Sequence, residues 1–217
     1  MIEVGDKPVT FTAHESLLCA RSEFFRTAMK KDWQEGQHKV VTLPYDSSGV
    51  VQLYLQTLCS GQAVFDGIPR PGRHSILISL YVLGERLLDY ISQDQVITKI
   101  IAIYREFDAP ENSSRLCEPA GQADINAGYE GTPPGSPLRR LLVNHYIARA
   151  ANGQCLEDMD AAFAADIARE LMQHVRMGAF AAGSFPDFER GSACRYHRHR
   201  LDESCGVQSQ FGHHWIG

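Results

Sequence analysis

The order of hydrophobic patterns along the chain restricts the fold more than any single residue does. Alternation in Val9-Thr10-Phe11-Thr12-Ala13 predicts a half-buried strand, and the β-branched segment 39–43, which stops at Pro44, predicts a second strand. Later periodic segments have helical spacing instead. Because the strands come first and do not alternate with helices, the sequence predicts an α+β fold: a small N-terminal sheet capped by a helical cluster and followed by further helices.

Helical spacing and capping residues locate the expected helices. Ser22 is expected to cap the second of two short helices within residues 17–29. Ser92, with Gln95 three residues later, has the pattern of a capping box. Ser136 and Pro137 are typical of a helix start. The longer helices are expected over about 46–61, 76–87, 92–104, 136–145 and 158–178.

A change of composition at Asp108 predicts the domain organisation. Residues 1–107 are dense in periodic apolar side chains and predict one domain. Residues 108–137 are rich in Pro, Gly, Glu and Asn and predict a linker or mobile loop. Residues 138–178 predict a C-terminal helical extension, and residues 179–217 a flexible tail.

Charge and hydropathy restrict the partners and the compartment. The chain has 217 residues, 44% of them hydrophobic, and a net charge of −5, so it lacks the basic surplus of nucleic-acid-binding proteins. No run approaches the roughly 18 apolar residues of a membrane span. The N-terminus lacks the basic leader and apolar stretch of a secretory signal. We therefore expect an intracellular protein, in cytoplasm and/or nucleus, that binds neither nucleic acid nor membrane and has reduced cysteines.

The segment 9–25 resembles the signature of the BTB/POZ family, in which a strand leads into a histidine, two leucine-like positions, a serine and a phenylalanine pair. Residues 41–44, 51–61 and 80–87 resemble later blocks of the same family in the same order. The resemblance implies a non-enzymatic protein-binding module over residues 2–107, with the histidine buried and hydrogen-bonded. The structural core of the signature is expected to comprise His14, Leu17, Leu18, Ser22, Phe24 and Phe25.

Further resemblances concern the C-terminal part and self-association. Residues 130–143 resemble the helical extension of the short, standalone BTB proteins of filamentous fungi. BTB domains commonly form homodimers through an exchanged first strand and a helix that precedes it. This chain starts at Met1, in or just before its first strand, so a homodimer is expected to rely on a smaller interface around Leu17 and Leu18.

Trp33-Gln34-Glu35 resembles the hydrophobic-x-Glu motif of BTB domains that recruit a cullin scaffold of a ubiquitin ligase. By this resemblance, Trp33 enters a pocket of the cullin and Glu35 makes polar contacts at its rim. An exposed tryptophan is also typical of a binding hot spot. In the alternative interpretation, Trp33 folds back over the helix pair and Glu35 is solvated.

A C-terminal cluster of Cys194, His197, His199 and Cys205 contains ligands that zinc prefers. Four of them within twelve residues could close a structural site, which would give a zinc-stabilised C-terminal module. The spacing fits no standard zinc finger, and a tail rich in His and Arg without bound metal is the alternative.

Catalytic patterns are weak in this sequence. The pairs Cys19 with His14 and Cys155 with His145 have no companion carboxylate at a telling position, and no phosphate-binding loop or nucleophile elbow occurs. We therefore expect no enzyme. The basic clusters suggest either contact with an acidic partner or a solvated surface, and they comprise Arg139, Arg140, Arg195, Arg198 and Arg200.

Overall fold

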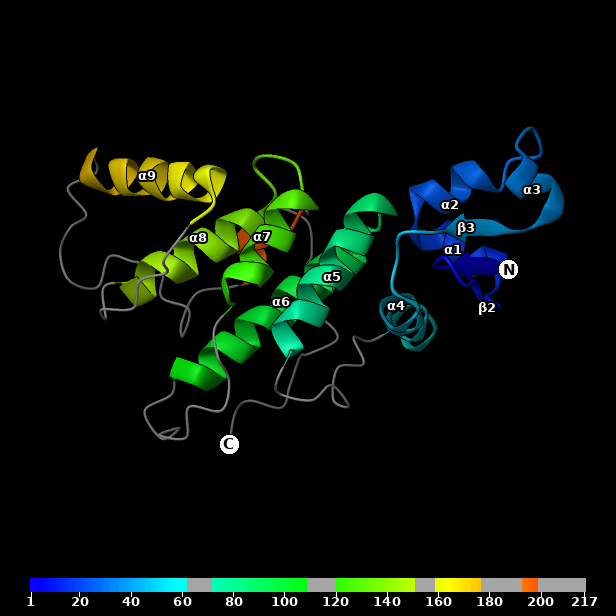
Figure 1. The fold of residues 1–217 in the computed structure, drawn as a ribbon, viewed down its shortest axis with the longest axis horizontal. Coiled ribbons are helices and arrows are strands. Elements are labelled where there is room, and N and C mark those ends of the chain that lie inside the picture. The colour runs from blue at the N-terminus through cyan, green and yellow to red at the C-terminus, as the bar shows by residue number, and fades with distance from the viewer. Residues whose placement is uncertain (62–71, 109–119, 151–158, 177–192, 199–217) are drawn as a thin grey trace.

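The computed structural model describes residues 1–61, 72–108, 120–150, 159–176 and 193–198 (Figure 1). These residues form a small three-stranded sheet and a larger set of helices, so the predicted α+β class is confirmed, while the BTB/POZ fold itself stays a prediction. The strands are β1 (Ile2–Val4), β2 (Val9–Phe11) and β3 (Val41–Leu43). The helices are α1 (Glu15–Arg21), α2 (Glu23–Ala28), α3 (Gln34–His38), α4 (Ser48–Ser60), α5 (Arg73–Arg86), α6 (Tyr90–Asp108), α7 (Gln122–Glu130), α8 (Pro137–Ala150), α9 (Ala161–Arg176) and the 3-10 helix η1 (Ala193–Tyr196).

The sheet has the order β2-β1-β3, with β1 antiparallel to β2 and parallel to β3. A parallel pair requires a crossover connection, and here the chain reaches β3 through β2 and the helices α1 to α3. Ile2 and Val4 are buried on either side of Glu3, and Val41 and Leu43 are buried in β3. This alternation places one face of the sheet on the core.

Both predicted strands form, over the shorter ranges 9–11 and 41–43. The sequence did not predict β1. The turn after β1 begins at Gly5, whose φ of +82° favours glycine, and the Gly5 amide donates to the Leu43 carbonyl at 3.1 Å. This hydrogen bond ties the turn of the first hairpin to β3.

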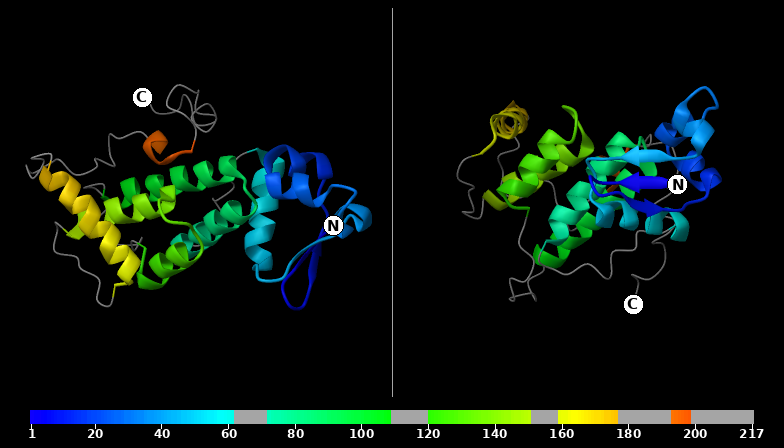
Figure 2. Two further views of the ribbon diagram at one scale, coloured as in Figure 1. Left: turned by 90° about the horizontal axis from the view of Figure 1, so that it is seen from above. Right: turned by 45° about the vertical axis from the view of Figure 1, so that its right-hand side comes forward.

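Helices α5 and α6 lie side by side at the centre of the molecule (Figures 1 and 2). Their facing residues, including Leu77, Leu80, Ile97 and Ile100, are completely buried. The same continuous apolar cluster reaches from β1 to Phe163 in α9. The predicted ranges 1–107 and 138–178 therefore share one core, which burial of apolar surface stabilises as a unit.

Part of the predicted linker, 108–137, is a packed helix instead. Ile125 and Tyr129 of α7 are buried, and α7 lies against α5 and α8. Gly128 permits this approach, because a Cβ there would lie 3.2 Å from Leu142. The Gly-rich composition of this segment predicted a loop, but in α7 the small residue Gly128 allows close packing between helices. Residues 109–119 lie outside the described part of the chain.

The helix caps agree with the prediction at Ser22 and differ from it at Ser92. Ser22 caps α2, because its Oγ accepts a hydrogen bond from the Phe25 amide at 3.1 Å. The predicted capping box at Ser92 is wrong: α6 begins earlier, and Asp89 accepts from the Ser92 amide at 3.0 Å. Asp89 is therefore the residue that caps α6.

The predicted flexible tail, 179–217, is ordered at least over residues 193–198. This segment forms η1 and lies against α6 and α8 (Figure 2). Arg198 donates to both carboxylate oxygens of Glu85 at 2.6 and 2.7 Å, and its amide donates to Asp94 at 3.0 Å. No periodic pattern predicts this contact, because it depends on single side chains and not on an apolar stripe.

Candidate functional site

Trp33 lies at the N-terminal cap of α3 and exposes 56% of its surface. Backbone hydrogen bonds fix its position: the Trp33 amide donates to the Lys30 carbonyl, and its carbonyl accepts from the Gln37 amide, each at 3.1 Å. Both backbone polar groups of Trp33 are thus hydrogen-bonded, while more than half of the residue is exposed to solvent. This placement disagrees with the alternative in which Trp33 folds back over the helix pair.

The residues around Trp33 make a tight turn. Gly36 is buried, and a Cβ there would lie only 2.0 Å from the Lys30 carbonyl oxygen, so no larger residue fits without a backbone shift. Gln37 adds a side-chain hydrogen bond to the Lys31 carbonyl at 3.2 Å. Glu35 is half-buried in the first turn of α3, where a carboxylate is favoured by the helix dipole. The structure thus brings Trp33 and Glu35 together on one hydrogen-bonded turn.

The residues of the BTB-like signature divide between the core and the surface. Leu18 and Phe25 are buried, and Phe24 is half-buried with its ring edge-on to Phe25 at a centroid distance of 5.4 Å. Leu17 is 38% exposed on α1. The inward packing of the phenylalanine pair agrees with expectation, whereas Leu17 belongs to the surface that the sequence also suggested for self-association.

The expected burial of His14 is wrong. Its side chain is exposed and makes no capping hydrogen bond at the start of α1. Only its backbone takes part in the fold, because the His14 carbonyl accepts from the amides of Leu17 and Leu18 at 3.1 and 3.2 Å. At this position the chain therefore departs from the buried, hydrogen-bonded histidine that the family resemblance implies.

A buried polar junction that the sequence did not reveal fixes the α1–α2 pair to the helical body. Asp89 is completely buried and accepts hydrogen bonds from Arg21 at 3.3 Å and Tyr54 at 3.1 Å. Ser22 donates to the Leu87 carbonyl at 2.5 Å. Burial, together with the negative charge of Asp89, raises the pKa of the Tyr54 hydroxyl, which therefore stays a proton donor.

The proposed zinc ligands are only partly within the described residues. Cys194 is half-buried in η1, and His197 is buried with its Nε2 at 2.9 Å from Thr98 Oγ1. His199 and Cys205 lie outside the described residues. In the part of the chain that the structure covers, no group of three His, Cys, Asp or Glu residues could hold a metal ion.

The structure describes three of the four residues in the candidate nucleophile–histidine pairs. Burial raises the pKa of the Cys19 thiol, with Glu15 adding to the effect, so the thiolate is disfavoured. His145 is buried in the core, stacked on the Tyr104 ring at a centroid distance of 3.4 Å. Cys155 lies outside the described residues.

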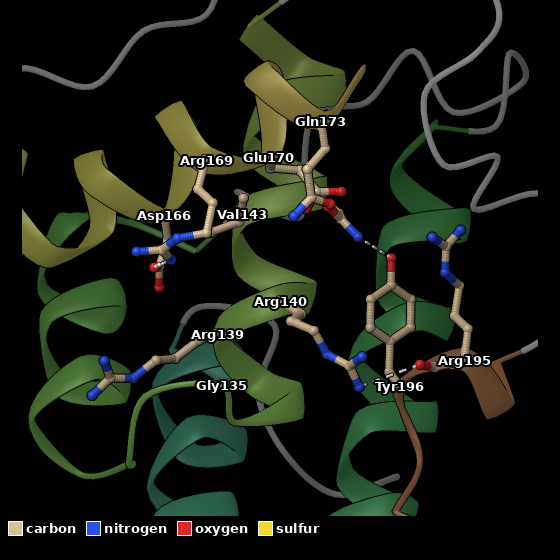
Figure 3. A pocket seen from close by; sticks show the side chains of 11 residues that line it. Gly135, Arg139, Arg140, Val143, Asp166, Arg169, Glu170, Gln173, Arg195 and Tyr196 are labelled. Atoms are coloured by element: carbon tan, nitrogen blue, oxygen red, sulfur yellow. Dashed lines mark hydrogen bonds and ion pairs between the residues drawn. The ribbon is translucent and has the colours of Figure 1, made fainter. Parts of the chain in front are cut away.

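A cleft of about 500 Å³ opens between α8, α9 and η1 (Figure 3). Arg139, Arg140 and Arg195 were predicted as basic clusters, but the cleft was not predicted, because its walls come from segments separated by up to about 60 residues. Asn144 donates to the Tyr196 hydroxyl at 2.9 Å and joins two walls. The lining residues are Gly135, Arg139, Arg140, Val143, Asn144, Asp166, Arg169, Glu170, Gln173, Arg195 and Tyr196.

Comparison with models of protein families, with curated proteins and with solved structures found no match. Within the described residues, no helix combines the length and the apolar character needed to cross a bilayer.

Proposed function

We propose that this chain is a non-enzymatic protein-binding module of the BTB/POZ type, intracellular as its sequence suggests, and that its partner docks on the turn carrying Trp33. The supporting observation is the 56% exposed indole on a backbone that Lys30, Gly36 and Gln37 hold in place. A residue whose backbone is already held by hydrogen bonds loses less conformational entropy when a partner covers it.

The expected contribution of this anchor is large enough to govern affinity. A buried aromatic side chain removes about 150–250 Å² from water, and roughly half of that area is still exposed at Trp33. At about 25 cal/mol per Å², covering the rest contributes about 2–3 kcal/mol, which is the size of a binding hot spot. Loss of the indole is therefore expected to weaken partner binding by about 30- to 150-fold.

The first form of this proposal is a substrate adaptor that recruits a cullin scaffold through Trp33 and Glu35. Its support is that both residues lie on the same turn, the indole exposed and the carboxylate half-buried beside it. The second form is a free-standing scaffold that binds another protein or a second copy of itself without a cullin. Here the exposed Leu17 on α1 is the residue we expect in a homodimer contact.

Pull-down of the tagged full chain, with mass spectrometry and immunoblotting for cullins, tests the proposal. The variant Trp33→Ala/Glu35→Ala is expected to lose the partner. Tyr45→Ala is the matched control, because Tyr45 is 91% exposed and its loss also removes a surface aromatic. Specific capture of a cullin by the wild type and the control alone supports the adaptor. Capture that the double variant leaves unchanged contradicts the binding turn.

Light scattering after size-exclusion chromatography tests self-association. A dimer that Leu17→Asp converts to a monomer supports the scaffold form, with the exposed Glu23→Gln as a control on the neighbouring helix. A monomer at every concentration excludes the homodimer and leaves the Trp33 test unaffected.

The zinc-stabilised C-terminal module stays a separate proposal. Its support is that Cys194 and His197 lie within five residues on a segment docked to the helical body. Elemental analysis of the purified chain is expected to find one equivalent of zinc, which Cys194→Ser removes. A metal-free wild-type chain contradicts this module.

A further inference from the structure

Residues 193–198 lie on the outside of the helical body, against α6 and α8 (Figure 2). Three consecutive side chains of this segment, those of Tyr196, His197 and Arg198, each reach a different polar partner on the helices. The helices thus contact the segment as a protein contacts a peptide ligand, one side chain at a time, although this ligand belongs to the same chain.

Arg198 has the most specific of these contacts. Its guanidinium donates to both carboxylate oxygens of Glu85 in α5 at 2.6 and 2.7 Å, and it lies over the Tyr90 ring at 5.1 Å from the centroid. The planar guanidinium combines an ion pair with a contact over a ring, which the compact ammonium group of lysine does less well. The backbone amide of Arg198 also donates to Asp94 at 3.0 Å. This position therefore favours arginine over lysine.

Tyr196 and His197 are held by polar side chains of α8 and α6. The buried Tyr196 hydroxyl accepts a hydrogen bond from Asn144 at 2.9 Å (Figure 3), and His197 Nε2 lies 2.9 Å from Thr98 Oγ1. The Thr98 hydroxyl donates to the Asp94 carbonyl at 2.9 Å, so it accepts from His197. The helical residues that contact the segment are called the docking surface, and they comprise Glu85, Asp94, Thr98 and Asn144.

The docking surface and the segment differ in how the core holds them. The surface lies on α5, α6 and α8, whose apolar side chains form much of the core. Among the described residues of the segment, only Ala193 and Tyr196 pack on that core. A segment with few apolar contacts opens at a low free energy compared with the core helices. The segment can therefore leave while the docking surface stays formed.

We infer that the docking surface binds a peptide of a partner protein with the sequence Tyr-His-Arg, and that residues 196–198 occupy it as an intramolecular competitor. The inference does not rest on the role proposed for Trp33, because it uses other residues. Glu85 and Asp94 both contact the arginine position, which favours a basic peptide. A competitor tethered in the same chain has an effective concentration of about 1 mM, so it weakens the binding of a partner until it is displaced.

Fluorescence anisotropy with a dye-labelled peptide tests this inference. The peptide has the sequence of residues 193–198 with serine in place of the cysteine, and the full chain is titrated into it. Tyr196→Ala/Arg198→Ala weakens the intramolecular contacts, so this double variant is expected to bind the peptide about tenfold more tightly than the wild type does. The peptide of reversed order is the control and should bind to neither protein.

A third change locates the peptide on the docking surface. Glu85→Gln, added to the double variant, is expected to weaken peptide binding by about tenfold, because the arginine loses its charged acceptor. Glu23→Gln is the matched control, since it removes the same charge from an exposed position of α2. Lysine in place of the peptide's arginine should also cost about tenfold, but little when Glu85→Gln is present, because both changes remove the same contact.

The wild-type chain supplies a second measurement that does not require the double variant to fold. Excess unlabelled peptide is expected to displace the segment and to speed proteolytic cleavage of the C-terminal part, whereas the reversed peptide should not.

Three outcomes overturn the inference. The first is no peptide binding by a double variant with native circular dichroism or, where that variant is unfolded, wild-type cleavage that the peptide leaves unchanged. The second is equal binding of the reversed peptide. The third is a wild-type dimer that Arg198→Ala converts to a monomer, which would reassign the docking surface to an exchange of segments between two copies. Peptide binding that Trp33→Ala leaves unchanged and Glu85→Gln weakens supports the site independently of the Trp33 turn.

Discussion

Asp89 and Arg139 are both buried charged side chains, yet the regions around them are built differently. Asp89 accepts from Arg21 and Tyr54, which are 68 and 35 residues away in the sequence, on α1 and α4. Arg139 donates to groups only 7 and 10 residues away, in the α7–α8 connection. The Asp89 junction therefore links distant elements, whereas the Arg139 junction shapes one local loop.

This difference predicts unequal consequences of losing each charge. Without Asp89, Arg21 and Tyr54 lose their common acceptor, and the contact of α1 and α4 with the start of α6 loosens. Without Arg139, the carbonyls at the end of α7 lose a donor, but water can reach a loop more readily than a helix junction.

Asp89→Ala is expected to destabilise the fold by about 3–5 kcal/mol, since it leaves the half-buried Arg21 uncompensated and the buried Tyr54 hydroxyl without its acceptor. Equilibrium unfolding in urea, followed by circular dichroism, measures this loss. Asp6→Ala, at an exposed position, is the control and should change stability little. A loss below about 1 kcal/mol for Asp89→Ala contradicts the assignment of Asp89 as the long-range junction.

Arg139→Met is expected to cost about 2–3 kcal/mol, because several buried carbonyl acceptors lose a charged donor while the apolar stem is retained. Arg140→Met, at the adjacent exposed position, should leave stability nearly unchanged. The same urea titration compares the two. If Arg139→Met destabilised the chain more than Asp89→Ala, the ranking of the long-range junction above the local one would fail.

His74 is expected to make the α7 side of the core sensitive to acid. Burial lowers the pKa of His74 from its ordinary 6.5, Asp124 opposes this, and Arg73 adds to it. The unfolded chain then binds the proton more readily than the folded chain, so stability is complete above pH 6.5 and falls as the pH drops below it. The expected slope is up to about 1.4 kcal/mol per pH unit.

His74→Phe tests this dependence, because phenylalanine can keep the stack on Tyr104, whose ring centroid lies 5.4 Å away, without titrating. Urea unfolding at a series of pH values below 6.5 should show a shallower decline for the variant than for the wild type. Parallel curves for the two proteins would exclude His74 as a source of acid sensitivity.

Arg198→Ala is expected to have the smallest effect, about 0.5–1 kcal/mol, because its pair with Glu85 is partly exposed. The loss should shrink in about 1 M salt, which screens such pairs. Limited proteolysis should also cut the C-terminal segment faster in the variant. Arg176→Ala, at an exposed position of α9, is the control. Unchanged proteolysis would show that Tyr196 and His197 hold the segment without Arg198.

The elements that the sequence predicted are those that depend on local patterns. Period-two alternation located β2, β-branched residues before a proline located β3, and helical spacing located α4, α5 and α6. Ser22 was correctly placed as a cap. The errors concern residues whose role depends on distant neighbours. His14 is exposed, α7 occupies part of a predicted linker, and Asp89 caps α6 in place of Ser92.

The candidate sites show the same division. Trp33 and Glu35 could be proposed as a site from the sequence, because only one residue separates them and they stay close in space in any fold. The cleft could not, because Arg140 and Arg195 are 55 residues apart and meet only through the docking of η1.

The sequence alone determined the α+β class, the position of the sheet at the N-terminus and the helical spacing of the rest, because these follow from propensity and from the period of apolar residues. The tertiary structure decided which charges are buried and paired, which tryptophan atoms face solvent and which arginines share a cleft. Those properties depend on distances between residues far apart in the chain, and no local pattern encodes such distances.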